Sequence, residues 1–300
     1  MAEAKTKTVL VTGATGRQGG AVVRHMLPKG WRLRALTRNP ASHAAKELAR
    51  LGIEVVAGDL ENPASLAPAL AGAHGVYSVQ DFWSVGARRE VEQGKNLANA
   101  AQRAGIAHFV YSSVGGAERH SGIDHWESKW QIEQHIRALG LPATILRPVA
   151  FMEDYYIDQV EIGLLKGKLM DPIRADKPYQ TIAADDIGAF VALAFERPQD
   201  FIGQALEIAG SELTNPEAAE VFSRVLGKHV KFRKLPMLAV RLFLGKEFHQ
   251  MFRWFNESGF EADIAALRRN YPQIRLRKLE EWLRDEGWHK RAKHVRAPKG

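Results

Sequence analysis

Apolar and polar positions change their spacing regularly through the first half of the chain. Short apolar or alternating runs at residues 8–12, 31–37, 53–56, 75–79, 106–112 and 143–146 predict six strands. Between them, apolar residues recur at helical spacing in a first run that ends near Leu27, and then at about 42–51, 63–70, 89–104 and 126–139. Strands that alternate with helices pair in parallel through right-handed crossovers, so the pattern predicts an α/β fold with a doubly wound parallel sheet.

After Pro148 the alternation becomes less regular. Strands are expected at 205–209 and 230–233, and helices at about 216–226, 236–255 and 278–286. No stretch rich in Pro, Gly or Ser separates the two halves. We therefore expect a first domain over residues 1–150, a smaller C-terminal α/β lobe over 151–288 that interleaves with it, and a basic tail over 289–300.

A glycine-rich turn follows the first predicted strand. Gly13, Gly16 and Gly19 have the spacing G-x-x-G-x-x-G and lead directly into the first predicted helix. Turn glycines let the backbone approach a pyrophosphate, and the amide groups and dipole of the helix N-terminus favour its negative charge. Three glycines in another context would indicate an ordinary turn, but the position between a first strand and a first helix favours dinucleotide binding.

The ends of the next strands suggest which nucleotide. Thr37 and Arg38 stand where an NAD-binding domain has an acidic residue, and a guanidinium there suits a 2′-phosphate. We therefore expect NADP(H), the alternative being an arginine in a surface loop. Asp59 could border the adenine or simply hold a turn. Gln80 begins a loop whose aromatic residues either line a substrate pocket or pack.

A third group of polar residues follows the fifth strand. Ser112 and Ser113 end that strand, and His125 and Lys129 lie four residues apart, on one face of a helix. Lys129 could donate to the nicotinamide ribose, and a serine hydroxyl could contact the ring carboxamide or a substrate carbonyl. A solvated His/Lys pair is the alternative.

Composition limits the remaining choices. The 300 residues are 45% hydrophobic and contain no cysteine, which excludes disulfides, thiolate metal sites and cysteine nucleophiles. No metal is expected. Residues 1–7 are polar, so we expect no signal peptide, and no apolar run approaches the roughly 18 residues that would span a bilayer. We therefore expect a cytoplasmic protein without a membrane partner. Much of the +8 charge lies near the C-terminus. A solvated basic tail explains it better than nucleic-acid binding, for which no motif is found.

The chain resembles the NmrA-like family, an atypical branch of the short-chain dehydrogenase/reductases, and is especially similar to its HSCARG type of NADPH sensor. The resemblance rests on residues 13–20, 37–40, 92–95, 125–129 and 146–148, and extends weakly through 185–188 to 251–254. It implies a Rossmann domain that binds NADP(H). The cofactor-binding residues that it implies are Gly13, Thr15, Gly16, Arg17, Gln18, Arg38 and Lys129. To these we add Gly19, Asp59, Leu60, Gln80, Ser112 and Val149 as predicted cofactor-binding residues.

One departure from the wider superfamily concerns catalysis. Reductases of that superfamily use a Tyr-x-x-x-Lys pair, whereas His125 stands at the tyrosine position here. Histidine can act as acid or base near neutral pH, so Lys129, His125 and Ser113 are the candidate catalytic residues.

Two functions fit these residues, and a third fits less well. The leading interpretation is a redox-sensing regulator with weak or no turnover, acting on a partner protein or as a homodimer. The alternative is an NADPH-dependent reductase of a quinone, enone or similar small apolar substrate. Direct nucleic-acid binding through the basic C-terminal region is the weakest of the three.

Overall fold

The computed structural model describes residues 7–294, and the chain divides into two compact units. Unit 1 extends through Arg147 and also takes in Ala184–Glu207. Unit 2 consists of Pro148–Ala183 and the chain from Ile208 onward. The chain therefore leaves unit 1, begins unit 2, returns to unit 1 for two helices and most of one strand, and then completes unit 2.

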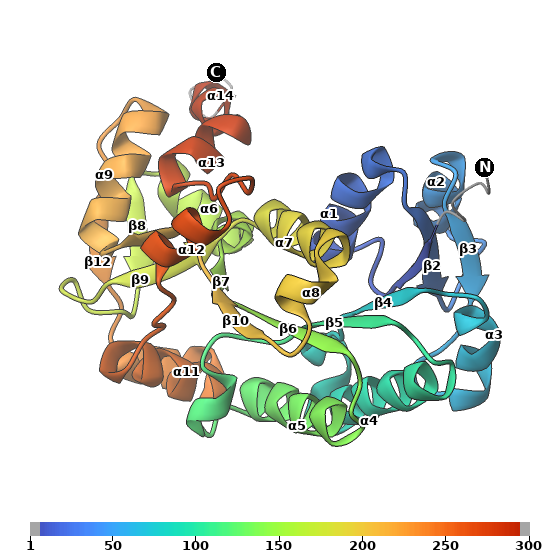
Figure 1. Ribbon diagram of the computed structural model, residues 1–300. Coiled ribbons are helices and arrows are strands. Elements are labelled where there is room, and N and C mark those ends of the chain that lie inside the picture. Colours follow the sequence, from blue (N-terminus) through green and yellow to red (C-terminus); the bar gives the residue numbers. More distant parts are fainter. Residues whose placement is uncertain (1–6, 295–300) are drawn as a thin grey trace. The chain divides into compact units, whose positions relative to one another are not determined.

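Unit 1 is built on a seven-stranded sheet with the order β10-β6-β5-β4-β1-β2-β3 (Figure 1). The strands are β1 (Thr8–Val11), β2 (Arg32–Thr37), β3 (Glu54–Ala57), β4 (Gly75–Ser78), β5 (His108–Ser112), β6 (Ala143–Pro148) and β10 (Ala205–Ile208). β1 pairs in parallel with both β2 and β4, so the strand order reverses direction between β1 and β4. This order is that of the Rossmann fold, and ligands of such sheets bind beyond the carboxyl ends of the strands at the reversal.

Helices cover both faces of this sheet. They are α1 (Arg17–Met26), α2 (His43–Arg50), α3 (Leu66–Leu70), α4 (Phe82–Arg103), α5 (Asp124–Ala138), α7 (Ala184–Glu196) and α8 (Pro198–Phe201). α4 and α5 lie side by side on one face, and α1 packs against α7 on the other (Figure 1). α1 and α7 come this close because Gly188 has no side chain: a Cβ there would lie 2.5 Å from the Ala21 carbonyl carbon.

Unit 2 has two small sheets. One has the order β11-β9-β7, from β7 (Ala150–Phe151), β9 (Tyr179–Ile182) and β11 (Ser211–Leu213); the other pairs β8 (Lys168–Asp171) with β12 (Lys231–Lys234) in parallel. Its helices are α6 (Asp158–Leu165), α9 (Asn215–Leu226), α10 (Met237–Phe243), α11 (Gly245–Glu257), α12 (Ile264–Asn270), α13 (Leu279–Asp285) and α14 (Trp288–His294). Phe222, Trp282 and Trp288 are fully buried in its core.

The structure corrects three expectations about these elements. The single helix expected over 236–255 is two helices, because Gly245 has a φ of +89° that ends the first. α4 begins at Phe82, where a loop was expected, and is kinked at Gly86. The segment expected to be a solvated tail begins as α14, and Arg291 in it pairs with Glu161. Residues 295–300 lie outside the described residues.

Candidate functional site

The glycine turn between β1 and α1 has the shape expected of a phosphate-binding loop. Gly13 has a φ of +61°, and its carbonyl accepts a hydrogen bond of 2.8 Å from the Gly16 amide. A Cβ at Gly19 would lie only 2.2 Å from the Gly13 carbonyl oxygen, so the loop can lie this close to α1 only with glycine at position 19. Thr12 Oγ1 accepts a hydrogen bond of 2.8 Å from the Val79 amide, which ties the ends of β1 and β4 together at the reversal of strand order.

The loop is open on its outer side. Gly13, Thr15, Gly16 and Arg17 are exposed, and α1 carries no acidic residue in its first turn. The first amide groups of a helix have no acceptor within the helix, so this end favours an anion. Gln18 is held from two sides, since its Oε1 accepts from Ser112 Oγ at 2.6 Å and from the Tyr77 hydroxyl at 3.3 Å. Two of the sequence-predicted residues, Gln18 and Ser112, therefore meet.

The end of β2 carries Arg38 on an exposed surface, and a carboxylate lies within its electrostatic reach. Glu61, after β3, accepts hydrogen bonds from Arg89 Nε at 2.9 Å and Gln93 Nε2 at 2.8 Å. These two bonds, chiefly the one from Arg89, lower the pKa of Glu61, and the charge of Arg38 lowers it further. The Glu61 carboxylate is therefore hydrogen-bonded to Arg89 and Gln93, whereas the effect of Arg38 on its pKa is electrostatic.

Asp59 and Leu60 have structural roles in the same loop. One oxygen of the Asp59 carboxylate accepts from the Glu61 amide at 2.9 Å, which is the turn-holding role considered for it as the alternative. The Leu60 carbonyl accepts from Asn96 Nδ2 at 2.9 Å, and its side chain packs against the core. The last predicted cofactor residue, Val149, belongs to unit 2, where it is buried and its amide donates to the Ile208 carbonyl.

Buried polar atoms without a partner lie at the carboxyl ends of β4 and β5. Among the described residues, Gln80 Oε1, Ser113 Oγ and the Tyr111 hydroxyl are buried with no hydrogen bond. Such groups are costly unless water or a ligand satisfies them. Gln80 and Ser113 were both predicted from the sequence as site residues. Their unsatisfied atoms, with the open glycine loop, provide a set of donors and acceptors that fits a dinucleotide.

Lys129, on α5, is paired with a buried carboxylate on α4. Its Nζ donates at 2.7 Å to Glu90 Oε1, and Ser128 Oγ bonds to the other oxygen of the same carboxylate. Glu90 is fully buried, and the side chain of Lys129 is 14% exposed. Glu90 was not among the residues predicted from the sequence. Its position in the chain carried a signal, because Glu90, Gly94 and Leu97 fall on one buried face of α4, and an acidic residue on such a face needs a partner.

His125 lies on α5 one turn before Lys129, as its spacing predicts, but its surroundings are aromatic. It is buried, and its ring centroid lies 5.3 Å from that of Phe82 and 5.1 Å from that of Trp83. The helical start of α4 places these two aromatic residues here. The aromatic residues considered for a pocket or for packing are therefore in contact with the candidate catalytic histidine.

No tyrosine of unit 1 replaces the missing phenol. Burial raises the pKa of the Tyr77 phenol, and burial together with the charges of Glu90 and Glu133 raises that of Tyr111 well above its usual value. A phenol with a raised pKa is a weaker proton donor at neutral pH. In the part of the chain that the structure describes, no group of three His, Asp or Glu side chains could hold a metal ion, and no helix is long and apolar enough to cross a membrane.

Comparison with known proteins gives consistent relatives. An NmrA-like family domain-containing protein of Dictyostelium discoideum is 29% identical over 272 residues, covering 85% of this chain and 89% of that protein. The NAD(P)H azoreductase of Xenophilus azovorans is 30% identical over 225 residues, covering 75% and 76%.

Solved structures share the fold at lower identity. The negative transcriptional regulator NmrA in complex with NADP has a TM-score of 0.78 at 21% identity, over 98% of this chain and 99% of that one. The Escherichia coli NADPH-dependent quinone oxidoreductase in complex with NADPH has a TM-score of 0.78 at 23% identity, over 96% and 99%. The family model for NmrA-like proteins matches residues 5–283. With the sheet order, the glycine loop and this match over nearly the whole chain, the protein belongs to the NmrA-like family.

Proposed function

We propose that this protein binds NADP(H) at the carboxyl edge of the unit 1 sheet and acts as a nucleotide-dependent regulator with weak or no turnover, like the HSCARG-type sensors that its motifs resemble. The glycine loop and the start of α1 would hold the pyrophosphate, and Arg38 the 2′-phosphate. Gln80 and Ser113 would use their unsatisfied atoms on the nicotinamide half, and Lys129 would donate to the ribose. The NmrA regulator and the quinone oxidoreductase of similar fold were both solved with such nucleotides bound.

The pairing of Lys129 with Glu90 carries the regulatory part of the proposal. A reductase benefits from a positive charge near the oxygen that becomes negative during reduction. Here the ammonium group of Lys129 is bonded at 2.7 Å to a fully buried carboxylate, so the pair as a whole is neutral. The phenol that would donate a proton is replaced by His125 among aromatic rings, and burial raises the pKa of both tyrosines of unit 1. These features favour binding over rapid chemistry.

A reductase of small apolar acceptors is the second candidate, because of the aromatic cluster around His125. Trp83 is 59% exposed and lies beside both Phe82 and His125, a surface on which a flat quinone, enone or azo compound could stack. Bound NADPH would supply the hydride. His125 would hold a proton next to the acceptor, and Lys129 would orient the nucleotide.

Titration of the purified chain with NADPH, NADP⁺, NADH and NAD⁺ tests the shared part of the proposal, and a turnover screen with quinones, enones and azo dyes separates the two functions. We expect the phosphorylated nucleotides to bind more tightly, a change in protease cleavage when they bind, and no sustained NADPH oxidation. Lys129→Met should weaken binding, whereas the control Lys46→Met, on the exposed face of α2, should not.

Three outcomes decide between the candidates. Steady NADPH oxidation that Lys129→Met abolishes would replace the regulator with the reductase. Tight binding with no change in cleavage or self-association would contradict a sensor. Failure of all four nucleotides to bind would refute both functions at once.

A further inference from the structure

A stretch of unit 2 concentrates positive charge without any negative charge. Residues 228–246 contain six lysines and arginines and no aspartate or glutamate, in a chain whose net charge is +8. Five of the six are exposed on β12, α10 and the start of α11, namely Lys231, Arg233, Lys234, Arg241 and Lys246. This basic stretch adds to the basic residues that lie near the C-terminus.

The same stretch exposes large apolar side chains. Leu242 is 70% exposed, Phe243 83% and Leu244 51%, at the turn between α10 and α11. Leu238, one helical turn earlier on α10, is 69% exposed. α10 ends at Phe243, and the positive φ of Gly245 reverses the chain, so the apolar residues gather at a turn. Single exposed apolar residues are common, but a cluster this dense marks a contact surface.

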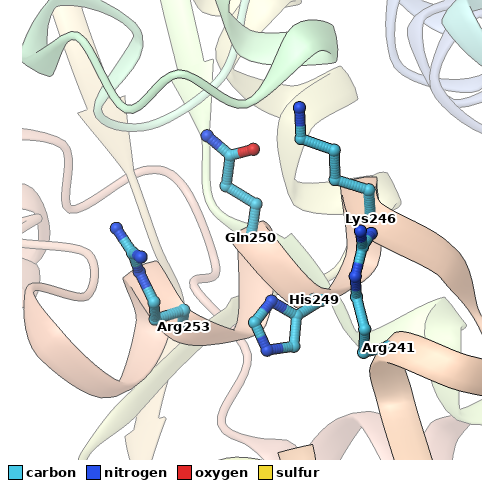
Figure 2. Close-up of a pocket in the computed structure, with 5 residues that line it drawn as sticks. All are labelled: Arg241, Lys246, His249, Gln250 and Arg253. Carbon is cyan, nitrogen blue, oxygen red and sulfur yellow. The ribbon is translucent and has the colours of Figure 1, made fainter. Parts of the chain in front are cut away.

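A concave surface beside this turn is lined mainly by basic side chains. It has a volume of about 390 Å³ and is lined by Arg241, Lys246, His249, Gln250 and Arg253, none of them acidic (Figure 2). Figure 2 shows Lys246, Gln250 and Arg253 projecting from α11, with Arg241 reaching toward Lys246 from α10. The ion pair of Arg253 with Glu257, at 3.5 Å, is exposed on both sides and so constrains the arginine little. The hollow suits an anionic group.

We propose that the turn between α10 and α11 docks on the surface of an anionic phospholipid bilayer. Leu242, Phe243 and Leu244 would enter the boundary between headgroups and acyl chains, while the basic side chains around them bind lipid phosphates. A nucleic acid would satisfy the positive charge but leave three apolar side chains without a partner. A bilayer surface offers both kinds of partner: negatively charged headgroups for the basic side chains, and hydrocarbon beneath them for the apolar side chains.

This association needs no membrane span. The sequence excluded a membrane partner because no apolar run is long enough to cross one, whereas a peripheral contact needs only a short apolar tip with basic residues around it. The proposal is independent of nucleotide binding, since all its residues lie in unit 2 and the glycine loop lies in unit 1.

Vesicle flotation of the full chain tests the proposal. We expect binding to vesicles of phosphatidylcholine mixed with phosphatidylglycerol, little binding to phosphatidylcholine alone, and loss of binding as salt is raised. Each basic side chain near an anionic surface changes the partition coefficient about fivefold, so Arg241→Glu combined with Lys246→Glu should lower it about twentyfold or more. Leu242→Ser combined with Phe243→Ser should lower it roughly tenfold or more.

Matched variants control for general charge and apolar exposure. Lys46→Glu combined with Arg103→Glu makes the same charge change on exposed residues of unit 1, and Leu51→Ser removes a side chain that is 57% exposed. Both controls should bind vesicles almost as well as the wild type. Unchanged circular dichroism of the Leu242→Ser/Phe243→Ser variant would show that a loss of binding is not a loss of fold.

Three results would overturn the proposal. The first is failure of the wild type to bind anionic vesicles at low salt. The second is equal binding by the wild type and the apolar variant, which would leave only non-specific charge attraction. The third is self-association in sedimentation experiments that the apolar variant abolishes while no vesicle binds, which would assign the surface to a second copy of the chain.

Discussion

The ion pair between Lys129 and Glu90 should be a strongly coupled unit, and a double-mutant cycle measures that coupling. Glu90→Gln removes the negative charge while keeping the shape, and Lys129→Met removes the positive charge while keeping the apolar stem. Each single variant leaves one charge without its partner in a place where water has little access. The double variant leaves neither.

The magnitudes follow from the burial of the two side chains. Glu90 is fully buried and its partner is 14% exposed, and removal of one member of a buried pair costs about 3 to 5 kcal/mol. Lys129→Met should cost more than Glu90→Gln, because it leaves the more deeply buried charge uncompensated. The cost of the double variant should fall short of the sum of the two single costs by about 2 to 3 kcal/mol, which is the coupling energy of the pair.

Urea denaturation without nucleotide is the assay, because a bound nucleotide would add its own stabilisation to the folded state. Glu47→Gln is the control, since its pair with Arg50 joins two exposed side chains and should change stability by about 0.5 kcal/mol or less. If the losses of Glu90→Gln and Lys129→Met simply add in the double variant, the two charges are not coupled, and the neutral pair in the proposed function is wrong.

Three further predictions concern separate parts of the molecule. Gly19→Ala should disrupt the loop and weaken NADPH binding at least tenfold in a fluorescence titration, since its Cβ would lie 2.2 Å from the Gly13 carbonyl oxygen. Gly20→Ala should be tolerated, because its Cβ would lie 3.5 Å from the nearest atom, the Ala14 carbonyl oxygen. Equal effects of the two substitutions would refute the steric argument. Arg38→Ala should weaken NADPH about 10- to 100-fold and NADH little, the loss of a charged hydrogen bond being about 1.5 to 3 kcal/mol; equal losses would remove Arg38 from the 2′-phosphate. Burial raises the pKa of Asp171 from 3.8 to about 6, so the folded state binds this proton more tightly than the unfolded state does. The folded state should therefore lose about 3 kcal/mol of stability as the pH rises from below 4 to above 6. Asp171→Asn should remove this loss in thermal melts across that range, and parallel pH profiles for the two proteins would contradict it.

The local patterns of the sequence were sufficient for unit 1. Its first six strands and the helices between them follow from apolar spacing, since each buries one face or stripe against its neighbours. The glycine turn could be placed for the same reason, because its chemistry is local to a strand and the helix that follows. Unit 2 was predicted less completely: strands such as β7 and β11 are two or three residues long and carry too little periodicity to detect.

Contacts between residues far apart in the chain could not be predicted from the sequence. Glu90 and Lys129 are 39 residues apart and meet because α4 and α5 pack side by side. Glu61 comes near Arg38 because β2 and β3 are parallel, so the loops that follow them begin at the same edge of the sheet. The break at Gly245 was also missed, since an apolar stripe continues across a glycine whose backbone angle the spacing does not reveal.

The sequence by itself determined the order of strands and helices, the phosphate-binding turn and the positions of His125 and Lys129 on one helix. These depend on interactions between residues a few positions apart. Only the tertiary structure decided what surrounds those side chains: the carboxylate on Lys129, the aromatic rings on His125, and the exposed apolar turn among cations in unit 2. Burial and electrostatic pairing depend on distances through space, and the folding of distant segments against one another sets those distances.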